Sequence, residues 1–390
     1  MKKVWIILII LLFSIIIFWQ MGGIDYLAAR TVFAPDHTTD LVDEEKAIIF
    51  SKDIEYEVES IGEGLEIPWE IAPLPEGGFL VTERPGRVVL LGSGEIYTVE
   101  GVEHVGEGGL LGMEISPNFQ EDAHVFLYYT YRSGNQIFNR LSRFTFAEDT
   151  LINEEYILNE IPGSRFHNGG RVKFGPDGKL YVTTGDAQNP NLSQNINSLA
   201  GKILRINSDG TIPEDNPFEN NPVFAYGLRN PQGLSWHPVT GELFASDHGP
   251  NSQDEINRIL PGMNYGWPIV SCSAGESQYE DPVVCYSDFT MAPSGIVFLP
   301  WDNIDETPLY VTGLRGNMVM RVDLDDEGNF IRQEPVISEY GRIRTIVYQK
   351  DSLYLATNNR DGRGVPNEND DVILRINIIK EEKSERKDYN

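Results

Sequence analysis

The sequence predicts an all-β fold, a six-bladed β-propeller made of four-stranded antiparallel blades. A short apolar-aromatic strand that ends in a small or hydroxyl residue recurs along the chain, at intervals of roughly 45 to 65 residues. This spacing is the size of a propeller blade with inserted loops. After residue 30, the chain shows no helical pattern longer than about two turns. The six repeated strands are 78–82, 125–130, 179–183, 242–246, 308–312 and 352–357.

A second set of β-type runs precedes the repeated strands and supports the assignment of blades. Most repeated strands follow a turn signal such as Pro176-Asp177-Gly178, and another short β-type run lies before that turn, as at 69–72 and 171–174. A doubly wound α/β fold would need helices between the strands. A pair of β-sandwiches is the remaining alternative. We place the six blades within residues 56–379.

The first 23 residues indicate a membrane-targeting segment, either a signal-anchor or a signal peptide. Two lysines precede a nearly continuous apolar run over residues 4–19. Positive charge stays inside, so the rest of the chain is expected to be exported. Because no clean cleavage motif follows, we favour an anchor at the outer face of the cell membrane, or secretion if it is cleaved. Residues 24–55 are then an acidic stalk, and residues 380–390 a charged tail.

Composition limits the class of partner and the redox compartment. The chain has 390 residues and a formal net charge of −28, so nucleic acid is excluded because its phosphates would be repelled. With 41% hydrophobic residues, the chain can bury a sizeable core. Its two cysteines, Cys272 and Cys285, lie close together, which in an exported protein predicts a loop-closing disulfide. Two free thiols are the alternative.

The loop around Gly249 and Pro250 is the most informative stretch for chemistry. Pro250 has no N–H and restricts the residue before it, so the backbone stays irregular and its carbonyl oxygens stay free. Asp254 and Glu255 follow a few residues later. Carbonyl and carboxylate oxygens are the ligands that calcium selects. The segment therefore indicates a calcium site, and an ordinary acidic turn is the alternative.

His167 is the candidate general base. It lies in a glycine-rich loop just before a predicted strand, where glycines let the backbone approach a ligand closely. Histidine can take up a proton near neutral pH. Asp186, just after the next strand, could orient the imidazole by accepting a hydrogen bond from its other ring nitrogen. A histidine that caps a turn would explain the same residue.

Arginines on turns flanked by Gly or Pro indicate an anionic ligand. Arg229 and Asn230 precede a Pro-Gln-Gly turn, and Arg315 lies in Gly-Leu-Arg-Gly. Arg342 and Arg344 alternate on one β-type segment, so both should point the same way. Guanidinium groups bind carboxylates in bidentate fashion. The alternative is ion pairing with the abundant Asp and Glu side chains at the surface.

Sequence motifs for several other chemistries are missing. The chain has no P-loop, and its glycine-rich segment at 105–112 lacks the strand and helix of a dinucleotide-binding fingerprint. It also has no Gly-x-Ser-x-Gly nucleophile elbow and no His-Glu-x-x-His helix. NAD, FAD and ordinary hydrolase mechanisms are therefore disfavoured.

Taken together, segments along most of residues 60–378 resemble the quinoprotein glucose/sorbosone dehydrogenase family. The resemblance implies a six-bladed propeller that uses pyrroloquinoline quinone (PQQ) and calcium. No single segment is specific, but their order and joint presence are. The matching segments are 67–69, 79–87, 107–112, 167–171, 227–233, 264–268 and 292–295.

The resemblance also implies roles for individual residues. His167 looks like the catalytic base with Asp186 as its partner, and Gly249 and Pro250 match the carbonyls that bind calcium next to PQQ. The cysteine pair falls where the family's glucose enzyme closes a short disulfide. The other matched residues are Arg229, Asn230, Arg342 and Arg344 as quinone contacts, Thr290 in a stretch that faces the cofactor, and Asp254, Glu255 and Tyr265 in a region that holds further calcium.

Two positions near the expected cofactor depart from the glucose enzyme. Glu107 stands where that enzyme has a glutamine, and a carboxylate there would repel the carboxylates of PQQ unless an arginine intervenes. Arg315 stands where that enzyme has a lysine, which keeps the charge but changes the fit. The chain also lacks the longer insertions of the glucose enzyme, so we expect a broader pocket for aldoses.

The expected function is oxidation of aldose sugars at C1 to the lactone, with His167 as base and hydride transfer to the quinone. Two electrons would then pass to an external acceptor. The first alternative is a calcium-dependent sugar lactonase, which would need carboxylate and Asn side chains gathered on one metal. The second is a propeller that binds calcium or another ligand without redox chemistry.

Overall fold

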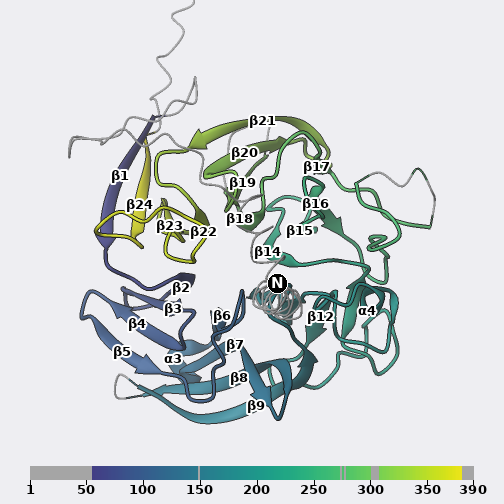
Figure 1. The fold of residues 1–390 in the computed structure, drawn as a ribbon, viewed down its shortest axis with the longest axis horizontal. Coiled ribbons are helices and arrows are strands. Elements are labelled where there is room, and N and C mark those ends of the chain that lie inside the picture. The colour runs from purple at the N-terminus through teal and green to yellow at the C-terminus, as the bar shows by residue number, and fades with distance from the viewer. Residues whose placement is uncertain (1–54, 148–149, 273–274, 276–277, 300–306, 380–390) are drawn as a thin grey trace, which may run out of the picture.

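The structure is a computed structural model that describes residues 55–147, 150–272, 275, 278–299 and 307–379. The described residues form six four-stranded antiparallel sheets arranged as blades around a common axis (Figure 1). In the first five blades, the strand that comes first in the chain lies nearest the axis, and each later strand pairs on its outer side. The first blade contains β2 (Pro68–Pro73), β3 (Phe79–Glu83), β4 (Arg87–Leu91) and β5 (Glu95–Thr98).

The second to fifth blades repeat this order, and two four-residue helices lie in their loops. The second has β6 (Leu110–Ile115), α3 (Phe119–Asp122), β7 (His124–Ser133), β8 (Gln136–Ala147) and β9 (Thr150–Pro162). The third has β10 (Val172–Phe174), β11 (Leu180–Thr184), α4 (Asn191–Gln194), β12 (Lys202–Ile206) and β13 (Val223–Tyr226). The fourth has β14 (Pro231–Trp236), β15 (Leu243–Asp247), β16 (Asp254–Ile259) and β17 (Val284–Tyr286). The fifth has β18 (Pro293–Phe298), β19 (Thr307–Gly313), β20 (Met318–Leu324) and β21 (Phe330–Ile337).

The sixth blade closes the ring with strands from both ends of the fold. It contains β22 (Ile343–Gln349), β23 (Ser352–Thr357) and β24 (Ile373–Ile379), and its outermost strand is β1 (Glu55–Gly62). β1 pairs antiparallel with β24, with Tyr56 opposite Ile378 (Figure 1). The Tyr56 side chain is buried, and its hydroxyl lies 3.1 Å from the hydroxyl of Tyr310 in the fifth blade.

These strands confirm the predicted six-bladed propeller. The repeated apolar-aromatic segments are the second strands of the blades, β3, β7, β11, β15, β19 and β23. They read as nearly continuous apolar runs because neighbouring blades pack on both of their faces. In one such cluster, Leu180 and Val182 of β11 pack with Phe126 of β7. The use of β1 in the last blade was not predicted.

The blade topology places two kinds of loop at one end of the ring. Because the strands are antiparallel, the start of an innermost strand lies beside the end of the second strand, as in the pairs Pro231–Asp247 and Ile343–Thr357. The loops that enter innermost strands and those that leave second strands therefore share one mouth. The predicted residues of the site all lie in or next to such loops, apart from Tyr265.

The predicted membrane segment, most of the stalk and the charged tail lie outside the described residues. Within the described residues, we find no helix with the length and hydropathy that a membrane span requires. The predicted disulfide is confirmed: Cys272 and Cys285 are joined, with their Cα atoms 5.5 Å apart.

If β1 closes the ring, removing its buried aromatic side chain should destabilise the whole fold. We expect Tyr56→Ala to lower the free energy of unfolding by about 3 to 5 kcal/mol, measured by chemical denaturation. Tyr56→Phe, which removes only the hydroxyl, should cost about 1 kcal/mol. Glu57→Ala, on the exposed face of the same strand, is the matched control and should change stability by less than about 0.5 kcal/mol. Equal stability of Tyr56→Ala and the control would contradict the closure.

Candidate active site

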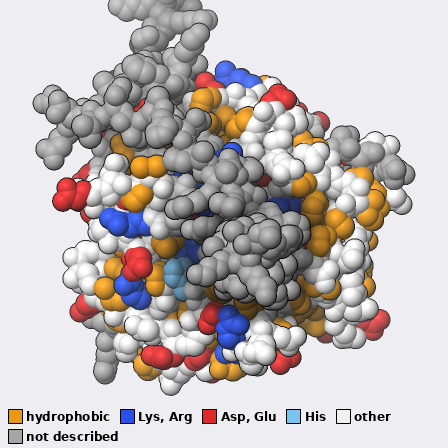
Figure 2. All heavy atoms as spheres, viewed as in Figure 1, with side chains coloured by type: hydrophobic (Ala, Val, Ile, Leu, Met, Phe, Trp, Pro, Cys, Tyr) orange, Lys and Arg blue, Asp and Glu red, His pale blue; other side chains and the backbone are white. Residues whose placement is uncertain are grey.

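The mouth of the ring gathers histidine, arginine and carboxylate side chains from five of the blades. On the face drawn in Figure 2, a histidine side chain lies near basic and acidic side chains. Asn230, before the fourth blade, accepts a hydrogen bond from the Gly169 N–H before the third blade at 2.9 Å. Glu107, before the second blade, accepts one from Arg363 in the sixth blade at 2.6 Å. Loops far apart in the sequence therefore meet here.

His167 and Asp186 form a hydrogen-bonded pair, as the sequence led us to expect. His167 Nδ1 lies 2.8 Å from Asp186 Oδ1. The Asp186 side chain is fully buried, whereas the His167 side chain is 20% exposed. Asp186 also accepts hydrogen bonds from the Gln188 N–H and from Trp267 Nε1, at 2.8 and 2.9 Å. Because Nδ1 is engaged by Asp186, Nε2 is the ring nitrogen left for chemistry.

Asp247 anchors the loop that carries Arg229 and Asn230. Its two carboxylate oxygens accept the Arg229 and Asn230 backbone N–H groups at 2.9 and 2.6 Å. Burial raises the pKa of Asp247 to about 6, although these two N–H groups favour its ionised form. The Arg229 side chain donates from Nη1 to the His248 carbonyl at 2.9 Å and lies over the Trp267 ring. The sequence analysis did not assign a role to Asp247 or Trp267.

Arg342 and Arg344 lie with Arg84 in a buried basic cluster. Arg342 donates to Asp361 Oδ2 at 2.8 Å and to the Leu314 carbonyl at 2.9 Å. Arg344 donates to Gln232 Oε1 at 2.6 Å. Burial lowers the pKa of Arg344 to about 9, and the neighbouring charges of Arg84 and Arg342 add to this effect. Burial likewise lowers the pKa of Arg84 to about 10. The cluster therefore carries positive charge that the protein compensates only in part.

Several buried nitrogen atoms in and around this cluster have no hydrogen-bond partner among the described residues. A buried donor without a partner costs free energy, so each such atom needs an explanation. A ligand that brings several acceptors and negative charge would satisfy them together. A flat quinone with three carboxylates has that chemistry, so the residues present fit PQQ. The unpaired atoms are Nε of Arg84, Arg229, Arg342 and Arg344, Nδ2 of Asn230 and Nε2 of His248.

Glu107 pairs with an arginine, Arg363, as a carboxylate near the expected cofactor requires. Its Oε1 accepts from Arg363 Nη1, and its Oε2 accepts the His167 backbone N–H at 3.2 Å. Burial alone would raise the pKa of Glu107, but Arg363 and His167 outweigh burial, and the pKa lies below its ordinary value. Arg363 was not predicted, although it lies in the glycine-rich segment Asp361-Gly362-Arg363-Gly364.

His248 is a second histidine in the site that the sequence analysis passed over. Burial lowers its pKa to about 3; Glu107 opposes this shift, and Arg344 and Arg229 add to it. The side chain is therefore neutral near pH 7. It directly precedes the predicted calcium loop, which was the available signal.

Hydrogen bonds and close packing fix the shape of the loop that holds Gly249 and Pro250. Asp254 accepts the Gly249 N–H at 3.0 Å and the Ala292 N–H at 2.8 Å, so its carboxylate braces the loop. A side chain at Gly249 would collide with the Gln253 carbonyl, so only glycine fits. The Pro250 carbonyl accepts the Gln253 N–H at 3.3 Å.

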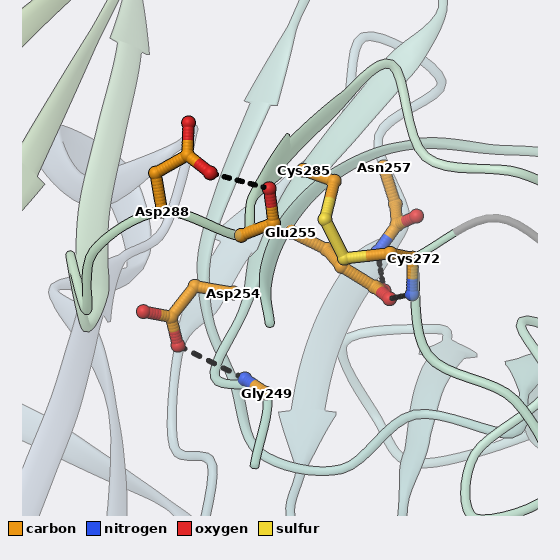
Figure 3. Close-up of a disulfide and its surroundings, with 8 residues drawn as sticks. Gly249, Asp254, Glu255, Asn257, Cys272, Cys285 and Asp288 are labelled. Atoms are coloured by element: carbon orange, nitrogen blue, oxygen red, sulfur yellow. Dashed lines mark hydrogen bonds between the residues drawn. A yellow bond between two sulfur atoms is a disulfide. The ribbon is translucent and has the colours of Figure 1, made fainter. Parts of the chain in front are cut away.

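Glu255 and Tyr265 have other partners. Glu255 points away from the loop, toward the disulfide, and accepts from the Cys272 N–H at 2.6 Å and from Asn257 Nδ2 at 3.0 Å (Figure 3). Burial raises the pKa of Glu255 to about 8, and the charge of Asp247 adds to the shift. The Tyr265 hydroxyl donates to the Arg258 carbonyl and accepts the Leu260 N–H. Within the described residues, no three His, Cys, Asp or Glu are grouped so as to hold a metal ion.

Thr290 and Arg315 lie at the edge of the site. Thr290 Oγ1 donates to the Asn251 carbonyl at 2.6 Å, which ties its segment to the loop after Pro250. The Arg315 backbone N–H donates to the Met291 carbonyl at 3.2 Å, and its side chain is half-buried. Thr290 therefore lies within the stretch that was predicted to face the cofactor, and Arg315 lies beside it.

Comparison with known proteins identifies the family and relatives with the same fold. The family model described as Glucose / Sorbosone dehydrogenase matches residues 65–374. Quinoprotein glucose dehydrogenase B of Acinetobacter calcoaceticus is 35% identical over 243 residues, which is 53% of this chain and 51% of that protein. Aldose sugar dehydrogenase YliI of Escherichia coli is 29% identical over 342 residues, 78% of this chain and 91% of that protein. The PQQ-bound aldose sugar dehydrogenase of Streptomyces coelicolor superposes with a TM-score of 0.76 at 38% identity, covering 83% of this chain and 98% of that one.

If the buried arginines serve to bind a ligand and not to stabilise the fold, replacing one of them with a neutral residue should stabilise the protein in the absence of ligand. We expect Arg344→Met to raise the free energy of unfolding by about 1 to 2 kcal/mol in the absence of any added cofactor. The lowered pKa means that the charged form is less stable in the folded state than in the unfolded state. Chemical denaturation would measure the change.

Arg321→Met is the control, because Arg321 is equally buried but paired with Asp323 at 2.7 Å. Breaking that pair should cost about 3 kcal/mol. Equal destabilisation by both substitutions would mean that the Arg344 charge is already compensated within the protein.

Proposed function

Because this chain belongs to the glucose/sorbosone dehydrogenase family, we propose that it is a PQQ-dependent dehydrogenase that oxidises aldose sugars at C1 to the lactone. The observation that carries the proposal is the set of buried, unpaired guanidinium donors beside the His167–Asp186 pair. The names of its relatives, an aldose sugar dehydrogenase and a quinoprotein glucose dehydrogenase, support the reaction class.

Arg229, Asn230, Arg342 and Arg344 would hold the cofactor. Their unpaired buried donors match a ligand that carries several anionic acceptors. Thr290 and Arg315 would border it, since both belong to loops at the same mouth. When bound, PQQ supplies the electron sink that no side chain of the protein provides.

Calcium is the second group that we propose at this mouth. Gly249 and Pro250 would hold it through backbone carbonyl oxygens, which are the ligands that calcium prefers, and the ion would act as a Lewis acid beside the quinone. The brace from Asp254 to Gly249 supports a loop of fixed shape. We further propose that Glu255 and Tyr265, together with Asp254, belong to a second calcium site.

His167 would be the general base. Asp186 accepts the hydrogen bond of Nδ1, so the neutral imidazole has its lone pair on Nε2. Nε2 would take the proton of the anomeric hydroxyl, while the C1 hydrogen would leave with its bonding electron pair as a hydride, for which the quinone would be the acceptor. Trp267 and Gln188 hold Asp186 in place and so fix the orientation of the imidazole. An acceptor outside the protein must then take both electrons.

The direct test uses the full-length chain in detergent with a panel of aldoses. We expect dye reduction that requires both PQQ and calcium and that EGTA abolishes. In His167→Gln, kcat should fall by about 10²- to 10⁴-fold, because the base is lost while the shape of the site is kept. Lactone cleavage without PQQ would instead establish a hydrolase. Bound calcium without turnover of any aldose would establish a non-redox binding protein.

We also propose that the folded domain lies outside the cytoplasm, at the outer face of the cell membrane. The Cys272–Cys285 disulfide supports this, because such bonds persist in oxidising compartments. A protease added to intact cells should therefore degrade the domain. Protection until the cells are lysed would contradict the proposed location.

A further inference from the structure

Glu107 contacts both the candidate base and the basic side of the site. Its Oε2 accepts the His167 N–H at 3.2 Å, and its Oε1 accepts Arg363 Nη1 at 2.6 Å. His167 enters the third blade, whereas Arg363 follows the second strand of the sixth blade. One carboxylate therefore joins loops from distant parts of the ring. The Glu107 side chain is 20% exposed and the Arg363 side chain 29%, so a ligand can reach the pair.

The field of Glu107 extends across the basic cluster. The charge of Glu107 acts on Arg84, on Arg344 and on His248, besides Arg363 itself. Each of the first three carries an unpaired buried nitrogen. A carboxylate in this position offsets part of the positive charge that would attract an anionic ligand, and it also repels that ligand directly.

We propose that Glu107 is a counter-charge that limits how tightly the site binds its anionic cofactor, and that it also positions His167. The inference rests on the proposed function, since it takes the cofactor to be PQQ. Glu107 neutralises Arg363 while the site is empty. The negative charge of Glu107 also cancels part of the attraction that the buried arginines with an unpaired Nε would exert on a tricarboxylate. These are Arg84, Arg229, Arg342 and Arg344.

The second half of the proposal concerns the backbone of His167. This residue has a backbone φ of 59°, in the left-handed region that residues other than glycine adopt only at a cost in free energy. The hydrogen bond from the His167 N–H to Glu107 supports that conformation. A glutamine at position 107 could still accept this bond through its amide oxygen, but it would have no charge. The two roles can therefore be separated by substitution.

The experiment is calorimetric titration of PQQ into the full-length, calcium-loaded protein in the absence of sugar. We expect Glu107→Gln to bind PQQ with a Kd at least fivefold below that of the wild type, because one repelling charge is removed. Glu103→Gln is the matched control: it removes the same charge four residues earlier, from an exposed pair with Arg132 at 2.8 Å. Its Kd should stay within twofold of the wild type.

A second variant guards against a change in fold. Arg363→Met leaves Glu107 without its cation, so PQQ should bind at least fivefold more weakly. Adding Glu107→Gln to this variant should restore much of the affinity, which a misfolded site would not allow. Melting temperatures of all variants would show that they are folded.

The role toward His167 is read from kcat at saturating PQQ. Glu107→Ala, which cannot accept the His167 N–H, should lower kcat about tenfold, and Glu107→Gln should recover most of that loss. No recovery would overturn the positioning role.

The counter-charge role is overturned if wild type binds PQQ and Glu107→Gln binds it less than fivefold more tightly. If neither protein binds PQQ, the proposed function fails together with this inference. The two failures are thus distinguished by the wild-type titration alone.

Discussion

The central feature of the site is a set of buried arginines whose positive charges the protein does not fully balance. Burying these charges lowers the stability of the fold, and the proposed binding of an anionic cofactor relies on them. Arg84, Arg342 and Arg344 are each less than 7% exposed, and each keeps an unpaired Nε. Their mutual repulsion and lost hydration must be offset by the rest of the fold. A closed ring of six packed sheets can do this, because its loops are attached to rigid strands at both ends. The His167–Asp186 pair lies beside this cluster. The loops at this mouth of the ring therefore place a candidate base next to the buried positive charges.

The fold could be predicted because its second strands are covered on both faces. Packing between neighbouring blades demands apolar residues at successive positions, as in β11 and β19, where every residue is buried. That demand leaves a local pattern in the sequence. β1 leaves no such pattern, because it lies at a blade edge and its pairing with β24 joins residues more than 300 positions apart. The ring closure is visible only in three dimensions.

The site was predictable where chemistry and spacing agree, and unpredictable where ordinary charged residues are brought together by folding. His167 and Asp186 flank the first two strands of one blade, so antiparallel pairing brings them to the same end. Arg363 and His248 carry weaker signals, a glycine-rich segment and a neighbouring Gly-Pro loop, and a single arginine or histidine on a loop usually has a surface role. Asp254 lies near Gly249 and Pro250, and its carboxylate braces the backbone by accepting two N–H groups.

Thermal unfolding of the full-length protein with and without PQQ tests the central claim most directly. A ligand that satisfies the unpaired guanidinium donors binds only the folded state and must raise its stability. We predict that PQQ with calcium raises the melting temperature by several degrees, whereas glucose alone does not. An unchanged melting temperature at saturating PQQ and calcium would show that the buried arginines are not a receptor for this anion.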